Sequence, residues 1–164
     1  MSEASGERGP KSGPKRANAR SAARLAAVQA LYQQSAQATP MARLLDEFHQ
    51  HRLGAEIEGD QYAEAETAFF DDVVKGVDAR ADEINSAIEA RLADGWTLAR
   101  LDKTMIQILR AGTYELLARP DVPIASVISE YLDVAHAFFD AREAKFVNGV
   151  LDAIAKDAVA RGRR

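Results

Sequence analysis

The sequence predicts an all-α protein with about seven helices in a compact bundle. Over most of the chain, apolar residues recur three and four positions apart, which is the period of an amphipathic helix. No segment shows the apolar–polar alternation or the β-branched enrichment that indicates a strand. Pro40 and Pro123 stand where helices are expected to begin, a position that proline favours.

The first 16 residues are expected to form a disordered basic arm. They contain three Gly, two Pro and three Ser and no apolar anchor, so they cannot build a core. Residues 17–160 are expected to form one helical domain, followed by a basic tail at residues 161–164. The first helix is predicted to start near Ala17, with an inward stripe made of Leu25, Val28, Leu31 and Tyr32.

Three further helices are predicted before residue 93. Thr39 and Pro40 are predicted as the N-cap and first residue of the second helix. Asp60 opens the third helix after a loop at residues 54–59, and Asp78 is predicted to cap the fourth. The third helix is expected to be central because its apolar face is broad, with Tyr62, Phe69, Phe70, Val73, Val74 and Val77.

The second half of the chain predicts three helices. The fifth follows Trp96 and extends to Leu116, with a possible break near Asp102. Pro123 is expected at the first position of the sixth helix. The side chains that this helix is expected to bury are Val127, Ile128, Tyr131, Ala135 and Phe138.

The seventh helix, residues 140–160, contains two conflicting signals. Asn148-Gly149 is typical of a β-hairpin turn. Five apolar residues nevertheless share one helical face, and Asp140 with Glu143 resembles a capping box, so a helix is favoured. Gly149 is therefore expected to permit close packing. The five apolar residues are Phe146, Val147, Val150, Leu151 and Ile154.

Composition excludes several classes of function. The chain has 164 residues, 47% of them hydrophobic, and no cysteine, so disulfides and thiolate metal sites are excluded. No secretory signal or membrane span is visible, which favours a cytoplasmic protein. Catalytic signatures are absent, so no enzyme and no cofactor are predicted. His49 and His51 are expected to be surface residues because i and i+2 diverge on a helix.

The uneven charge indicates a possible polyanion site. Residues 1–24 carry +4 and residues 156–164 carry +3, whereas the net charge of the chain is −4. Basic ends on an acidic body suit a polyanion, although solubilising tails are an equal alternative. Arg16, Arg20 and Arg24 are spaced by four and are predicted to lie along one side of the first helix.

Single-stranded RNA is the favoured polyanion because no pair of helices shows a clear recognition face for duplex DNA. Sequence preference on single-stranded RNA requires stacking platforms and partners for base edges. Phe146 and Asn148 are candidates for these roles, with Lys145 as a nearby cation. A core position for Phe146 is the alternative that helical periodicity favours.

Several motifs occur in the order found in the NusB family of transcription antitermination factors, which the chain resembles over residues 16–158. These motifs are Ala27–Tyr32 after spaced arginines, Phe70–Val77, Arg100–Lys103, Ile108–Arg110, Tyr114–Leu116, Asp121–Pro123 and Lys145–Asp152.

The resemblance implies an all-α fold of two small helical subdomains. It also implies binding to the boxA element of nascent ribosomal-operon RNA, together with NusE, a small-subunit ribosomal protein. NusA, NusG and RNA polymerase would complete the antitermination complex.

Family positions map onto specific residues of this chain. Those implied to contact RNA are Arg16, Arg20, Arg24, Lys145 and Phe146, and Lys15 and Asn148 complete the predicted RNA-binding set. Tyr32 and Asp102 are the positions implied for the protein partner. Lys15 is expected to compensate for Ser21 and Ala22, which stand where the family often has further basic residues.

Two other functions are compatible with a helical domain of this kind. A similar helical domain precedes an RNA cytosine methyltransferase domain, but this sequence shows no cofactor-binding segment and no catalytic cysteine, which excludes that role for it. A helical protein-binding adaptor, or a homodimer without specific RNA recognition, is the remaining alternative.

Overall fold

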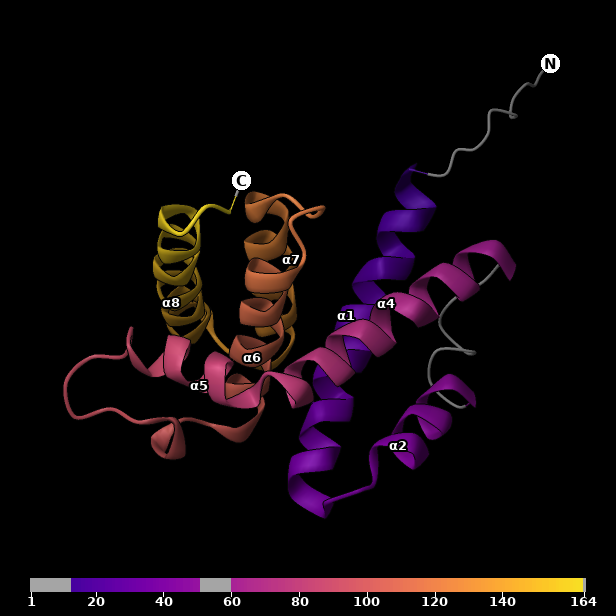
Figure 1. Cartoon of the computed structure of the whole chain (residues 1–164), viewed down its shortest axis with the longest axis horizontal. Helices are drawn as coiled ribbons and strands as arrows, with labels where there is room; N and C mark the ends of the chain where they lie inside the picture. Colours follow the sequence, from indigo (N-terminus) through magenta and orange to yellow (C-terminus); the bar gives the residue numbers. More distant parts are fainter. Residues whose placement is uncertain (1–12, 51–59, 164) are drawn as a thin grey trace.

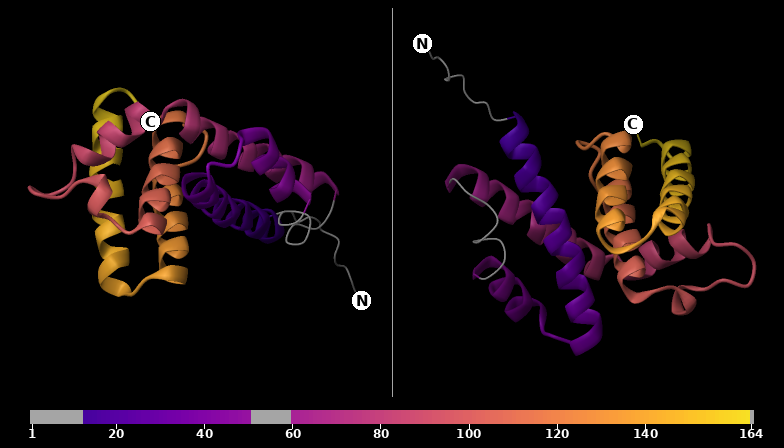
Figure 2. Two further views of the ribbon diagram at one scale, coloured as in Figure 1. Left: turned by 90° about the horizontal axis from the view of Figure 1, so that it is seen from below. Right: turned by 180° about the vertical axis from the view of Figure 1, so that it is seen from behind.

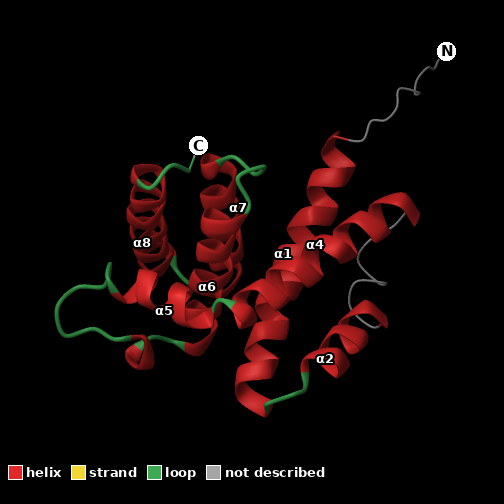
Figure 3. Ribbon diagram, viewed as in Figure 1, coloured by secondary structure: helices red, strands yellow, loops and turns green. Residues whose placement is uncertain are grey.

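The computed structural model describes residues 13–50 and 60–163, and for residues 13–18 and 60–65 it describes only the helix path. Within these ranges the chain is all-α, as predicted, with seven α-helices and no strand (Figures 1 and 3). The helices are α1 (Gly13–Gln37), α2 (Met41–Phe48), α4 (Asp60–Ala79), α5 (Ala81–Glu89), α6 (Lys103–Ala118), α7 (Ile124–Phe138) and α8 (Ala141–Ala160). A short 3₁₀ helix, Leu98–Arg100, precedes α6.

The helices form two groups that meet at α6. In the first group, α1 packs against α2 and α4; in the second, α5, α7 and α8 pack around α6. Helix α6 also contacts α1 and α4, and α7 contacts α1, so the two groups share one boundary. Figure 2 shows the same division from below and from behind. This arrangement agrees with the two helical subdomains that the resemblance implied.

One continuous apolar core joins both groups. Helix α4 is central to it, as predicted, with Phe70, Val73 and Val74 fully buried. The Phe70 ring stacks on Phe48 of α2 with 5.6 Å between ring centroids. Helix α8 contributes the fully buried Leu151. Burial of these side chains is the main force holding the groups together.

Several predicted helix starts are shifted. Helix α1 begins at Gly13 rather than near Ala17, so residues 13–16 of the predicted arm are helical and the rest of that arm lies outside the described residues. Pro40 was predicted as the first residue of the second helix, but it is the N-cap residue of α2, one position earlier in the helix. The prediction for Asp78 was wrong, because α4 continues to Ala79 and Arg80 precedes α5.

The predicted break near Asp102 and the predicted helix start at Asp140 are confirmed by hydrogen bonds. The Asp102 carboxylate accepts hydrogen bonds from the backbone N–H of Thr104 at 2.8 Å and of Met105 at 3.1 Å, so it caps α6. At α8, Asp140 and Glu143 form a complete capping box. The helix prediction for residues 140–160 is therefore correct.

The packing role predicted for Gly149 was wrong. A Cβ added to Gly149 would meet nothing within 4 Å. The glycines that permit close packing are in other helices. At Gly76 an added Cβ would lie 2.2 Å from the Tyr114 ring, and at Gly112 it would lie 3.1 Å from Leu151.

The predicted basic tail is partly structural. The Arg163 guanidinium donates hydrogen bonds to the carbonyl oxygens of Leu116 at 2.7 Å, Arg119 at 2.9 Å and Val122 at 3.0 Å. These carbonyls lie at and beyond the end of α6, where helix carbonyls lack intrahelical partners. Arg163 thus ties the C-terminal end of the chain to the α6–α7 connection. In the described part of the chain, no helix has the length and apolarity needed to cross a bilayer.

Candidate nucleic-acid interface

The basic residues of α1 have different environments, although their spacing predicts a single row. Lys15 and Arg16 lie in the first turns of α1, and their side chains fall outside the described residues. The Arg20 side chain is 26% exposed, and its Nε donates to Glu66 Oε1 at 2.9 Å. Its guanidinium lies 4.3 Å from the centroid of the Phe69 ring. Arg20 is therefore anchored on α4 and remains partly open to solvent.

Arg24 is inside the protein, so it cannot be the solvent-facing phosphate contact that was predicted. Only 3% of it is exposed. Its Nε and Nη2 donate to the two oxygens of the Glu115 carboxylate at 2.9 and 3.0 Å. Its Nη1 donates to Glu130 at 3.2 Å, and the Tyr131 hydroxyl donates to Glu115 at 2.5 Å. The four side chains join α1 to α6 and α7.

The electrostatics of this buried cluster favour a charged Arg24 and a neutral Tyr131. Burial disfavours the charge on Arg24, but hydrogen bonds and Coulombic attraction from Glu115 outweigh it, and the pKa of Arg24 is raised. Burial, together with the Glu115 charge, raises the pKa of Tyr131 well above its ordinary value. Tyr131 therefore stays a neutral donor, and Arg24 and Glu115 form a bidentate ion pair. The cluster is suited to holding helices together.

A second arginine cluster surrounds the Phe69 ring. The guanidiniums of Arg24 and Arg119 lie 4.9 and 5.1 Å from its centroid. Arg119 donates to Asp72 at 3.0 Å and to both oxygens of Asp121, at 2.8 and 2.9 Å. The hydrogen bond from Arg119 lowers the pKa of Asp121 to about 2. Acids balance the cations here, which makes this region a weak attractor for phosphate.

Helix α8 presents a cationic and aromatic surface, which we call the α8 face: Arg142, Lys145, Phe146 and Gly149. All four residues are exposed, and Phe146 is 36% exposed, whereas its neighbour Val147 is fully buried. Phe146 therefore stands outside the buried stripe that periodicity assigned to it. No ion pair among the described residues involves Arg142 or Lys145. The α8 face thus combines two unpaired cations with an exposed aromatic ring.

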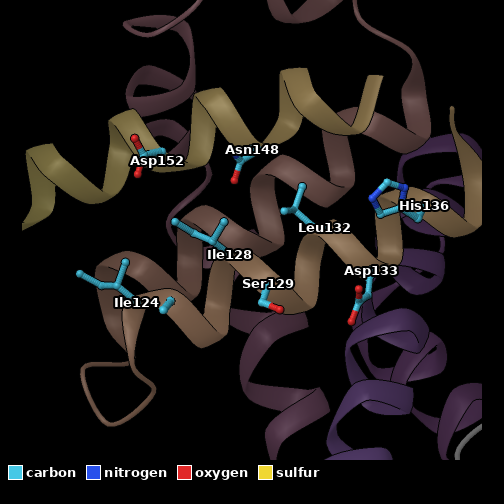
Figure 4. A pocket seen from close by; sticks show the side chains of 9 residues that line it. Ile124, Ile128, Ser129, Leu132, Asp133, His136, Asn148 and Asp152 are labelled. Carbon is cyan, nitrogen blue, oxygen red and sulfur yellow. The ribbon is translucent and has the colours of Figure 1, made fainter. Parts of the chain in front are cut away.

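Asn148 lies on another side of α8. Residues i and i+2 are about 200° apart on a helix, which separates Asn148 from Phe146. Asn148 lines a groove of about 490 Å³ between α7 and α8, together with Ile128 and Leu132 of α7 (Figure 4). Asp133 and Asp152 also line this groove, and their carboxylates disfavour phosphate. Asn148 therefore neighbours Lys145, three residues before it, but lies toward the α7–α8 groove and away from Phe146.

The two residues implied for the protein partner lie near one groove between α1 and α7. This groove, of about 340 Å³, is lined by Tyr32 and Gln29 of α1, Thr104 of α6 and Phe138 of α7. Asp102 caps α6 two residues before Thr104. Tyr32 is 42% and Phe138 is 44% exposed. We refer to this site as the Tyr32–Phe138 groove.

Sequence reasoning missed Phe138 and Arg142. Phe138 was expected to be buried because it lies seven residues after Tyr131, but α7 ends at Phe138, where fewer neighbours cover it. Arg142 lies three residues before Lys145 and four before Phe146, so the three side chains are neighbours on the helix surface. The i, i+3, i+4 spacing of exposed residues is the signal that could have identified Arg142.

The candidate residues belong to different helix groups. Helix α1 packs on α2, α4, α6 and α7, whereas α8 packs on α5, α6 and α7. Arg20 and Phe146 are consequently held on separate groups. The Tyr32–Phe138 groove spans the boundary between α1 and α7, and the chain runs from Phe138 directly into the start of α8.

The histidines in the described part of the chain form no metal site. His49 Nε2 lies 2.6 Å from Asp71 Oδ1, and His51 falls outside the described residues. Within the described ranges, no group of three or more His, Cys, Asp or Glu side chains is placed to hold a metal ion.

Comparison with known proteins gives consistent matches. The sequence model of the NusB family matches residues 21–156. A protein named transcription antitermination protein NusB, from Novosphingobium aromaticivorans, is 72% identical over 79% of this chain and 88% of its own length. Its counterpart from Sphingopyxis alaskensis is 70% identical over 79% of this chain and 87% of its own length.

Solved structures agree with these sequence matches. NusB from T. maritima is 31% identical, with a TM-score of 0.65 over 84% of this chain and 91% of that one. A chain from a crystal structure of antitermination factors NusB and NusE in complex with dsRNA is 27% identical. Its TM-score is 0.70 over 85% of this chain and 97% of that one.

Proposed function

The chain belongs to the NusB family, and from this premise we propose that it binds the boxA element of nascent ribosomal-operon RNA together with NusE. It is a transcription antitermination protein and not an enzyme. In the proposed role it acts in the cytoplasm, where it joins NusA, NusG and RNA polymerase to suppress termination.

The α8 face is the observation that carries the RNA-binding proposal. Phe146 offers an exposed ring on which a base can stack, and Arg142 and Lys145 carry charges that no described acid neutralises. Stacking on an aromatic side chain is the usual way in which proteins hold unpaired bases. A structural core role would not require an exposed phenylalanine beside two unpaired cations.

The basic residues of α1 supply a second RNA contact in this proposal. Lys15, Arg16 and Arg20 belong to the N-terminal turns of α1, and the Arg20 side chain is held by Glu66 and partly exposed. Arg24 makes no RNA contact in this proposal, because it is buried in the ion pair with Glu115 that joins α1 to α6. Asn148 faces the α7–α8 groove and is at most a peripheral contact.

NusE is proposed to dock at the Tyr32–Phe138 groove. The two exposed aromatic side chains of this groove, Tyr32 and Phe138, provide the apolar anchors that protein interfaces favour. Asp102 lies beside the groove at the start of α6 and offers an acidic rim. The solved structure of NusB and NusE in complex with dsRNA supports the proposal that this chain assembles with both a protein and an RNA.

The test compares boxA RNA with a scrambled RNA of the same composition, each titrated at two salt concentrations with and without NusE. We expect tighter binding to boxA RNA and a log–log salt slope of about −0.7 for each phosphate contact with a single strand. Equal, weak binding to both RNAs in the presence of NusE would contradict the proposal and favour a protein-binding adaptor.

Lys145 and Lys156 provide a matched pair of variants on α8. Lys145→Ala is expected to weaken boxA binding and to make the slope shallower by about 0.7. Lys156→Ala removes the same charge from the same helix, but Lys156 pairs with Asp152 and lies about 16 Å further along α8. That distance exceeds the Debye length at about 0.1 M salt, so this variant should bind RNA like the parent.

A further inference from the structure

Gly149 is the one member of the α8 face whose residue type the protein's own packing does not explain. It lies in the middle of α8 and is exposed, and an added Cβ would meet nothing within 4 Å. Glycine in an exposed helix interior lowers stability relative to alanine. Gly76 differs, because the Tyr114 ring occupies the place of its missing side chain. At Gly149 that space is open to solvent.

Helix geometry shows which surface the missing side chain leaves uncovered. Each Cα–Cβ bond in an α-helix tilts toward the N-terminus, so a side chain covers the turn that precedes it. The surface neighbours of Gly149 in that turn are Lys145 and Phe146, at i−4 and i−3. Any larger residue at position 149 would therefore cover the space between these two side chains.

The chemistry around this space suits a nucleotide. The Phe146 ring is partly exposed, and Lys145 and Arg142 are cations without a described acidic partner. The acids nearest on α8 are engaged elsewhere, since Glu143 closes the capping box and Asp152 pairs with Lys156. An aromatic ring, a cation and uncovered helix backbone can together contact a base, a phosphate and a sugar.

We propose that Gly149 is a determinant of RNA affinity, because its missing side chain lets an unpaired nucleotide lie against α8 between Lys145 and Phe146. The base stacks on Phe146 and the phosphate approaches Lys145 or Arg142. A base stacked within a duplex cannot present its face in this way, so the site between Lys145 and Phe146 selects single-stranded nucleotides. This inference rests on the proposed RNA-binding function and adds a residue to it.

The test uses the full chain and the boxA and scrambled RNAs described above. Gly149→Ala should raise the Tm by about 2–4 °C, because alanine favours the helix and the added methyl group meets no protein atom. The same variant should bind boxA RNA about fivefold more weakly. Gly149→Leu should weaken binding by up to about 100-fold, the range expected for losing one stacked base.

Ala153→Gly serves as the control for helix propensity. It lies one turn further along α8, so the double variant Gly149→Ala with Ala153→Gly should return the Tm close to that of the parent while RNA binding stays weak. Ala153→Gly alone should lower the Tm and leave RNA affinity within about twofold of the parent.

The outcomes distinguish a failure of the role proposed for Gly149 from a failure of the proposed RNA-binding function. If the parent prefers boxA RNA and both Gly149 variants bind it as tightly as the parent, the role of Gly149 is refuted and the RNA-binding function stands. Tighter binding by either variant would refute it as well. If the parent shows no preference for boxA RNA with NusE present, the proposed function fails, and the inference fails with it.

Discussion

Replacing Arg24 with alanine is expected to lower the free energy of unfolding by about 3–5 kcal/mol, because the change leaves a buried carboxylate without its cation. In the parent, Arg24 makes two hydrogen bonds to Glu115 and one to Glu130. Glu115 is fully buried, so water cannot replace the lost guanidinium. After the substitution, the Tyr131 hydroxyl would be the remaining described donor to that carboxylate.

This loss is large relative to the stability of a domain of this size. Natural domains unfold with about 5–15 kcal/mol, so the variant would lose a substantial fraction of its stability. At about 2–4 °C per kcal/mol for a chain of this length, the Tm should fall by about 6–20 °C. Exposed ion pairs contribute far less, about 1 kcal/mol or below.

Urea unfolding followed by far-ultraviolet circular dichroism measures the effect. Arg80→Ala is the matched control, because Arg80 also forms a bidentate pair, with Glu83 at 2.8 and 3.0 Å, but on the surface. The control should lose less than about 1 kcal/mol. A loss below about 1 kcal/mol for Arg24→Ala would refute the structural role assigned to the buried pair.

RNA binding supplies a second measurement on the same variant. At a temperature where Arg24→Ala is fully folded, its affinity for boxA RNA should stay within about twofold of the parent, because 3% exposure leaves no accessible phosphate contact. A large loss of affinity in the folded variant would show that Arg24 does contribute to RNA binding.

Three further substitutions give distinct results. Burial and a hydrogen bond to Asp72 raise the pKa of Tyr114 to about 12. The folded state therefore holds the Tyr114 phenolic proton more tightly than the unfolded state, so the free energy of unfolding should fall as pH rises from about 10 to 12. Tyr114→Phe removes this proton and should flatten the fall of the urea midpoint over the same pH range. Gly76→Ala places a Cβ 2.2 Å from the Tyr114 ring and should cost about 1–3 kcal/mol in urea unfolding, whereas an unchanged midpoint would show that the ring moves freely. Asp140→Ala removes a capping box and should cost about 1 kcal/mol in the same assay, with no loss expected if the α8 start is held by packing alone.

Helical period and cap residues predicted most of the fold. Most of the inward face of α8 was predicted correctly, with Phe146 as the exception, and the described part of the α4 face is buried as predicted, because broad apolar stripes leave one way to bury them. The side chain of Tyr62, also predicted on the α4 face, lies outside the described residues. The cap at Asp140 was recognised because its side chain acts locally, within three residues of the helix start. At Asp102 the sequence predicted only a break, and the structure shows that its carboxylate caps α6 there. The incorrect cap at Asp78 has a local cause as well, since Asp is favoured at helix starts but α4 continues through it to Ala79.

The candidate site was less predictable because it depends on contacts between distant helices. Spacing by four placed Arg20 and Arg24 in one row, but the burial of Arg24 depends on Glu115, which is 91 residues away in sequence. Phe138 follows the core period and is nevertheless exposed, because α7 ends there. Phe146 likewise fits the apolar stripe in sequence, yet it lies at the edge of that stripe.

Gly149 illustrates the limit of interpreting a residue type without its neighbours. A glycine inside a helix usually indicates close packing, and Gly76 and Gly112 fit that expectation. Only the absence of protein atoms around position 149 separates it from them.

Phe146→Ala, studied in parallel by RNA titration and urea unfolding, tests the central claim most directly. We predict that boxA affinity falls by about 1–3 kcal/mol, the contribution of one stacked base, while the free energy of unfolding changes by less than about 1 kcal/mol. Unchanged affinity, or a loss of stability of about 3–5 kcal/mol typical of a core phenylalanine, would contradict the assignment of the α8 face to RNA.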